Sequence, residues 1–277
     1  MHRLALILLV SLTSCPSSNR PAPPKAQVFI VEKEMTPFEG EVRGLKLFTP
    51  TGYIRVVEGP GLRVRIKYQI SATDALRAKE VADGCKPMWQ QAGETAEFLI
   101  GPPKDYPMER LGIGLEVYVP AGWDLDLGTR SGLLDTSTYR SHDQRLRSLS
   151  GDLRIGESTG LLSFQCDQGA IEIKGDFHEV RGRSEQGTLR IMKTTRGSKL
   201  QYRTRRGNVH VHLTPKIPLR VGLRTLEGSV HTNVSLTRRT ERMPGGWKME
   251  SLKIGKGEAP CGIDLVVEKG ALLLGMN

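Results

Sequence analysis

The sequence predicts an all-β protein: a right-handed parallel β-solenoid of short strands that start on glycine, preceded by a strand region with one short helix. Three observations predict this fold class. Units that begin on glycine recur through the second half of the chain, apolar residues alternate with polar ones after each glycine, and aromatic residues make up only 5% of the composition. One such unit cannot bury its apolar side alone, so successive units must stack. Parallel crossovers are almost always right-handed, which predicts the hand.

The repeat occupies residues 123–277. Apolar residues stand two and four places after the glycine, as in Gly151-Asp-Leu-Arg-Ile and Gly169-Ala-Ile-Glu-Ile. This alternation is typical of a strand with one buried face, and glycine supplies the positive φ of a tight turn. Spacings of mainly 9 and 10 residues predict one strand and one turn per unit. Units begin at Gly132, Gly151, Gly160, Gly169, Gly187, Gly207, Gly228 and Gly270, and one at Gly197 is shifted by a residue. An antiparallel sandwich remains the alternative.

Residues 27–122 form the N-terminal region. Alternation predicts strands over 45–48, 53–57, 62–68, 97–100 and 114–119. One helix is expected from about Thr73 to Asp83, because Asp74 can cap its start and Gly84 can stop it. Its apolar stripe would be Ala75, Leu76, Ala78, Val81 and Ala82. We expect the helix to cover a sheet face or one end of the solenoid.

The first residues predict export and lipidation. A short basic start is followed by an apolar run, Leu4 to Leu12, that is too short to span a membrane. Residues 1–14 resemble a bacterial lipoprotein signal peptide, and Cys15 would then be the lipidated first residue of the mature chain. By this resemblance the cysteine carries three acyl chains, palmitate among them. Three chains would anchor the protein stably in a membrane, whereas a single chain binds a membrane reversibly. An ordinary cleaved secretory signal is the alternative.

Residues 15–26 are a Pro-rich tether without apolar periodicity. The residue after the cysteine is Pro16 rather than aspartate, which favours the outer membrane over the inner membrane. The chain carries a net charge of +10, and loss of Arg3 with the signal leaves +9. A basic protein favours anionic partners. In an envelope these are acidic glycans, lipopolysaccharide or anionic lipid, whereas nucleic acid is not expected.

Three further cysteines follow Cys15, namely Cys85, Cys166 and Cys261. An oxidising compartment permits a disulfide, and an odd number leaves at least one thiol free or paired between chains. Their spacing matches no metal motif, and all three pairings stay open.

The order of these pieces is similar to a bacterial family of adhesin-like β-solenoid domains of unknown function. The shared pattern is a glycine turn at Thr51-Gly52, a Val119-Pro-Ala-Gly122 strand end, and a ladder of Ser/Thr-Gly units such as Ser150-Gly151-Asp152. The resemblance covers about residues 40–275. It implies a β-solenoid behind an export leader, with no established catalytic residues. The chain departs from the pattern where Gln168, Gln186, Arg196 and Arg206 replace the Ser/Thr before glycine.

A basic run provides one candidate site. Stacked turns lie about 4.8 Å apart, so cations near consecutive turns would form one ridge that an anionic ligand stabilises. The candidate ligand-binding residues are Arg190, Lys193, Arg196, Arg203, Arg205 and Arg206. A solvated basic face is the competing interpretation.

Histidines provide a second candidate. His210 and His212 lie on the outward side of one strand, and His231 holds the same place in its unit as His210. If those units are adjacent, the three imidazoles would converge into a metal site for zinc, copper or nickel. Exposed strand histidines without a metal are the competing interpretation.

Carboxylates provide a third candidate, at Asp124, Asp126, Asp135 and Asp152. Some β-helical polysaccharide lyases and hydrolases use clustered acids beside a basic residue. Here the acids are spread along the chain, and no hydrolase, metalloprotease or phosphate-loop motif occurs.

The sequence therefore predicts a lipid-anchored envelope protein that binds or scaffolds without chemistry and needs no cofactor. A carbohydrate-active enzyme and a structural spacer without a specific ligand are the alternatives. A groove with clustered Asp and Arg would favour the enzyme, and flat faces would favour the binding module.

Overall fold

The computed structural model describes residues 7–8, 26–35, 38–107, 110–192, 199–213, 218–233, 238–254 and 261–276. Within them the chain is mostly strand with one short α-helix, as predicted. Most of the predicted signal and tether, including Cys15, lies outside these residues. The strands that open the chain are β1 (Ile7–Leu8), β2 (Gln27–Glu34), β3 (Gly44–Glu58), β4 (Arg63–Ala72), β5 (Met88–Ala92), β6 (Thr95–Leu99) and β7 (Leu111–Val119).

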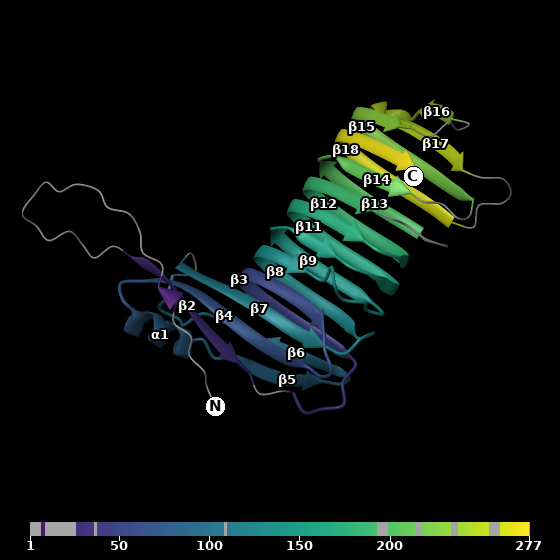
Figure 1. The fold of residues 1–277 in the computed structure, drawn as a ribbon. Coiled ribbons are helices and arrows are strands. Elements are labelled where there is room, and N and C mark those ends of the chain that lie inside the picture. Colours follow the sequence, from purple (N-terminus) through teal and green to yellow (C-terminus); the bar gives the residue numbers. More distant parts are fainter. Residues whose placement is uncertain are drawn as a thin grey trace, which may run out of the picture.

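The first strands form an antiparallel sheet in which β2, β4 and β7 are neighbours, and β1 pairs with β2. Strand β7 then pairs in parallel with the second half of β3, while the first half of β3 pairs with β6, which carries β5 at its edge. Strand β3 thus joins two sheets, and both continue into the rest of the molecule (Figure 1).

The helix α1 (Ala75–Gly84) forms where it was predicted. The Asp74 carboxylate accepts a hydrogen bond from the Arg77 amide at 2.8 Å, which caps the first turn. Ala78, Val81 and Ala82 are buried against β2 and β4, as expected of the stripe. Two details differ. Leu76 is 69% exposed because it points away from the sheet. The helix includes Gly84 and ends on Cys85 in an extended conformation, so no left-handed glycine stops it.

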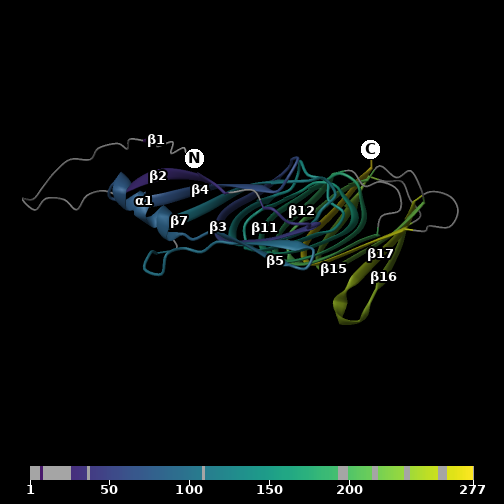
Figure 2. The ribbon, with the colours of Figure 1, turned by 90° about the horizontal axis from the view of Figure 1, so that it is seen from below.

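The second part of the chain is a parallel ladder. Its strands are β8 (Asp124–Asp135), β9 (Gln144–Ser150), β10 (Leu153–Ile155), β11 (Ser158–Lys174), β12 (Phe177–Met192), β13 (Lys199–Arg206), β14 (Val209–Leu213), β15 (Leu219–Thr232) and β18 (Cys261–Met276). Every pairing among these strands, and between β3 and β8, is parallel. Successive strands lie nearly on top of one another when seen from below (Figure 2). These pairings exclude an antiparallel sandwich for the ladder.

A column of stacked glycines marks the corner of the ladder. Gly132 pairs with Gly52, and Gly169 pairs with Gly187 at the same corner. The other members are Gly151, Gly207, Gly270 and Gly228. Consecutive members from Gly132 to Gly207 are 18 to 20 residues apart, because each repeat supplies one strand segment on each side of the corner. The predicted unit of one strand per 9 or 10 residues is therefore half of the true repeat.

The inward side of each segment carries the apolar residues of the alternation. Leu47, Leu127, Leu146 and Phe164 form one such row and are at most 3% exposed. Beside the corner runs a column of small hydroxyl residues, and Thr129 donates to the carbonyl of Ser131 at 3.1 Å. Thr49 and Thr204 make the same contact with the carbonyls of Thr51 and Arg206, at 3.1 and 3.2 Å, so these three threonines satisfy carbonyls at the bend.

Cys166 takes the place of a hydroxyl residue in this column, between Ser148 and Ser184, and its thiol donates to the carbonyl of Gly151 at 3.3 Å. Cys166 and Cys85 are both buried free thiols, so these two do not pair with each other. Burial raises the pKa of each thiol to about 11, which keeps it in the unreactive protonated form. The side chain of Cys261 lies outside the described residues.

The stacking order departs from the chain order at the C-terminal end. Strand β18 lies between β13 and β14 on one side and β15 on the other. Its inward residues, such as Leu265, Leu272 and Leu274, are at most 3% exposed. Because β18 has neighbouring strands on both sides, both of its hydrogen-bonding edges are paired. Beyond β15 the ladder ends in the antiparallel strands β17 (Lys248–Ile254) and β16 (Arg238–Arg242), with a 3-10 turn at Pro244–Gly246.

Candidate functional site

Four arginines meet on the outward face of the ladder, and we call them the arginine quartet: Arg145, Arg147, Arg181 and Arg183. Arg145 and Arg147 belong to β9, and Arg181 and Arg183 belong to β12. Strand β11 runs between them, with Ser163 in register with Arg145 and Arg181, and Gln165 in register with Arg147 and Arg183. The quartet lines a shallow hollow of about 300 Å³ whose floor is the shorter β11 side chains.

The repeat length explains why the quartet forms. Arg145 and Arg181 are 36 residues apart, which is two repeats of 18, and so are Arg147 and Arg183. Alternation then turns all four side chains outward, since Leu146 between the first two is buried. Gly182, between the second two, gives its space to the ring of Phe164, which would collide with any Cβ at that position. The core and the quartet thus arise from the same pattern.

The charges of the quartet are incompletely balanced. Among the described residues, Arg147 has no ion-pair partner, and Arg183 donates to the side-chain oxygen of Gln165 rather than to a carboxylate. Arg181 pairs with Glu179 at 2.7 Å, while the nearest Asp126 oxygen lies 3.8 Å from Arg145. Because cations two strands apart stand roughly 10 Å from each other, their repulsion in water is only about 0.4 kcal/mol per pair. An anion about 4 Å from an arginine gains about 1 kcal/mol in water and about 4 kcal/mol near a protein surface. The hollow therefore tolerates being empty and favours an anion.

Three neighbouring cations on this face are neutralised by ion pairs. At one end Lys46 binds Glu97 at 2.8 Å. At the other end Arg203 binds Glu268 at 2.8 Å and Arg224 binds Asp264 at 2.6 Å. Arg130 of β8, which lines a hollow next to Arg147, has no ion-pair partner among the described residues, so the unbalanced positive charge on this face extends from β8 to β12.

The structure divides the predicted basic ridge. Lys193 and Arg196 lie outside the described residues. Arg190 is in register with Glu172 and His210 on one side of the glycine corner, whereas Arg203 and Arg205 lie on the other side, in β13. Arg205 stands 3.9 Å from Glu185, and Arg206 is exposed next to the corner. The described members therefore do not gather on one surface.

The three predicted histidines surround one open depression of about 430 Å³, together with Asn233 and Leu273. They are not in adjacent strands, because Leu273 of β18 lies in register between His210 and His231. Partial burial, followed by the charges of Arg190 and His212, lowers the pKa of His210. In the described part of the chain the ligand atoms of these histidines do not come within 4.8 Å of one another as a group of three.

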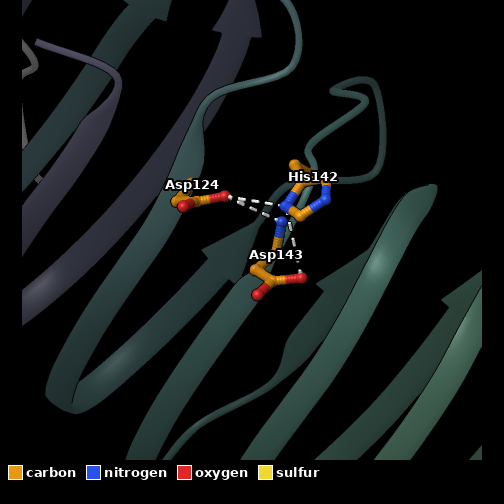
Figure 3. A group of neighbouring side chains, drawn as sticks. All are labelled: Asp124, His142 and Asp143. Atoms are coloured by element: carbon orange, nitrogen blue, oxygen red, sulfur yellow. Dashed lines mark hydrogen bonds and ion pairs between the residues drawn. The ribbon is translucent and has the colours of Figure 1, made fainter.

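One group does approach that closely, namely Asp124, His142 and Asp143 (Figure 3). The imidazole Nδ1 lies 3.4 Å from Asp124 Oδ1 and 3.5 Å from Asp143 Oδ1. Each of these oxygens also accepts a hydrogen bond from a backbone N–H group. Asp124 Oδ1 accepts from the Asp143 amide at 3.1 Å, and Asp143 Oδ1 accepts from the Leu161 amide at 2.6 Å. All three side chains are about half or more exposed. The group stabilises the ladder edge, and the imidazole lies between two carboxylates that would otherwise repel each other.

The other predicted carboxylates have local partners. Asp126 faces Arg145, and the Asp152 carboxylate accepts from the amide of Ala170 at 2.8 Å. Asp135 is buried, lies 3.4 Å from Arg55 Nε, and accepts from Ser137. Asp124 and Asp126 thus line one hollow, whereas Asp135 and Asp152 lie on the other side of the glycine corner. Sequence reasoning missed the quartet and the Asp143 partner of Asp124 because both depend on the full repeat, which is 18 residues in the first case and 19 in the second.

Comparisons with known proteins give distant structural similarities. No protein-family model matches the sequence, and no curated protein matches it. The chain is similar to the crystal structure of a "putative cell adhesion protein" from Clostridium sporogenes, with 10% identity, a TM-score of 0.33, and coverage of 91% of this chain and 100% of that one. It is also similar to a "putative adhesin" from Bacteroides fragilis (9% identity, TM-score 0.38, 90% and 97% covered). A third similar structure is a "putative lipid binding protein" from Parabacteroides distasonis (6% identity, TM-score 0.33, 88% and 96% covered). No helix in the described residues is both long and apolar enough to cross a membrane.

Proposed function

We propose that this chain is a bacterial envelope lipoprotein, anchored through Cys15, whose folded part is a non-catalytic binding or scaffolding module for an anionic envelope ligand. The leader and the tether support the anchored location. The parallel ladder supports a right-handed β-solenoid, an architecture that presents a rigid surface because each repeat is held by its neighbours. Anionic ligands in this compartment are acidic glycans, lipopolysaccharide and anionic lipid.

The arginine quartet is the observation that carries the proposal. Arginine presents a planar fork of donors that matches carboxylate, sulfate and phosphate groups. Arg147 and Arg183 have no carboxylate partner among the described residues, so their donors are available to a ligand. Ion pairs neutralise Lys46 and Arg203 on either side of the quartet, which supports the binding of an anion at the quartet itself.

The experiment compares the wild type with a variant in which all four quartet residues are changed to Gln. The purified chain without residues 1–14 and without lipid is titrated with polygalacturonate, lipopolysaccharide and phosphatidylglycerol vesicles at low and high salt. We expect the wild type to bind one of these classes in a salt-sensitive manner. The variant should bind about a hundredfold more weakly or worse, since hydrogen bonds to charged groups contribute about 1.5–3 kcal/mol each.

The matched control removes the same charge elsewhere, by changing Arg43, Arg110, Arg154 and Arg242 to Gln. All four are exposed and lie outside the quartet hollow. If the control variant loses as much affinity as the quartet variant, then overall charge and not the hollow is responsible. Absence of binding by the wild type to every probe would favour the spacer.

A glycan-active enzyme is the second candidate function, and one observation favours it. A neighbouring hollow of about 420 Å³ is lined by Asp124, Asp126 and Asp143 together with Arg145 and Arg181. Clustered acids and arginines in a groove are what such an enzyme needs. However, the His142 ring lies between Asp124 and Asp143, where a glycosidic bond would have to fit. New reducing ends released from polygalacturonate, and lost in Asp143→Asn, would establish the enzyme instead of the binding module.

A further inference from the structure

An apolar hollow adjoins the arginine quartet. Phe48 is 52% exposed and Leu149 is 50% exposed, and both line a hollow of about 420 Å³. Arg147 and Gln165 line this hollow and the quartet hollow alike, so the two are continuous. Large apolar side chains exposed beside unbalanced arginines are a combination typical of a ligand site, in which apolar contacts supply area and a few polar groups fix the orientation.

The aromatic ring and the arginines lie in one row across the strands. The register runs from Phe48 through Gly128 to Arg147, and on through Gln165 to Arg183. Gly128 has no side chain, so the Phe48 ring lies against its backbone, where an added Cβ would meet the ring at 3.0 Å. Phe48, Gly128 and Arg147 all line the hollow. Phe48, Arg147 and Arg183 consequently stand at intervals of two strands, roughly 10 Å.

We infer that the ligand of this face is an acidic polysaccharide that lies across the strands, with one sugar ring against Phe48 and its anionic groups on Arg147 and Arg183. This inference rests on the proposed function and names the ligand class. A sugar ring has an apolar face for the aromatic side chain and polar edges for Gln165 and the arginines. A polymer, unlike a small anion, spans a row that extends from β3 to β12.

The closed floor of the hollow argues against an acyl chain as the occupant. Directly beneath it, Leu47, Leu127 and Leu146 are at most 1% exposed. A lipid chain needs an apolar channel to replace the contacts it has in a membrane, and these packed side chains leave none below the hollow. A flat ring that rests on the surface fits this geometry.

The test removes the ring and retains the charges. Phe48→Ala is titrated with polygalacturonate and with polyglutamate, a polymer that carries the same carboxylates without sugar rings. We expect about tenfold weaker binding of polygalacturonate, the size expected for loss of a well-placed aromatic contact, with unchanged salt sensitivity and unchanged polyglutamate binding. Phe48→Tyr, which retains the ring, should restore binding of polygalacturonate.

The matched control is Leu76→Ala, because Leu76 is also a large apolar residue, is more exposed, and lies on α1 outside the hollow. Phe48 is half exposed, so its removal should leave the unfolding midpoint nearly unchanged, which confirms that the variant is folded. If Phe48→Ala binds polygalacturonate as tightly as the wild type while the quartet variant does not bind, the sugar inference is overturned and the proposed anion binding stands. If Phe48→Ala loses affinity equally for polygalacturonate, polyglutamate and phosphatidylglycerol vesicles, the sugar inference is also overturned, because the Phe48 ring would then not contact a sugar specifically. If the quartet variant keeps its affinity as well, the proposed function itself fails.

Discussion

At the scale of single residues, the glycine column fixes how closely the repeats approach. Gly151 has φ 146°, a conformation that disfavours any side chain. A Cβ added there would fall on the carbonyl oxygen of Gly132, and the same collision repeats at each step of the column. Gly151 is therefore required twice, by the backbone conformation of the bend and by the contact between bends, whereas Gly187 and Gly228 lack a positive φ and are required by the contact alone. Neither requirement depends on the polar residue that precedes each glycine, which explains how Gln168 and Gln186 are accommodated.

Gly151→Ala should lower the free energy of unfolding by about 2–4 kcal/mol, because the new methyl group is strained at this φ and also forces two repeats apart. Urea denaturation followed by circular dichroism measures this loss. Gly61→Ala is the control, since nothing lies within 4 Å of an added Cβ there and its φ is not positive. Equal stability of the two variants would contradict a packed glycine column.

At the scale of elements, the helix, the corner glycines and many of the strands could be predicted from alternation and turn residues, because these signals are local, whereas β2, β5, β16 and β17 were not predicted. The position of β18 could not be predicted. Its glycine, Gly270, fits the repeat template, but nothing local records that it stacks between Gly207 and Gly228. The position of β18 in the stack depends on how much the free energy of folding is lowered when both of its edges are paired. This quantity involves strands that are far apart in the sequence. The quartet failed to be predicted for a related reason: the period of 9 or 10 residues hid the 18-residue spacing that aligns Arg145 with Arg181.

The central place of β18 predicts a strong effect of proline. Val266 pairs with Arg203 on one side and Arg224 on the other. Val266→Pro removes a ladder hydrogen bond inside the sheet and should cost about 3 kcal/mol or more, which lowers Tm by about 6–12 °C for a domain of this size. Thr240→Pro, in the terminal strand β16 that pairs with β17 alone among the described residues, should lower Tm by less. If the two variants have the same Tm, β18 is not a central strand.

At the scale of the whole molecule, the ladder is elongated, and the quartet lies partway along it. Strand β2, which follows the tether, lies at the end opposite to β15, β16 and β17 (Figure 1). A chain anchored before β2 would hold the quartet away from its attachment point, where a polymer in the envelope can reach it. The same basic charge would also attract anionic lipid, so the proposed lipid anchor and the charge would be two separate causes of membrane association.

These two reasons respond differently to salt, and this difference tests the anchor. Acyl chains hold by burying methylene groups, about 0.8 kcal/mol each, and are insensitive to ionic strength, whereas surface attraction is screened within about 3 Å at 1 M salt. In the native host, Cys15→Ser should therefore move the protein from the salt-washed membrane fraction to the soluble fraction, and mass spectrometry should find no acyl chains. Cys85→Ser, which alters a buried thiol, should leave the protein in the membrane fraction. Release of the wild type by high salt alone would instead mean that charge is the anchor, and the quartet variant would then be released as readily at low salt.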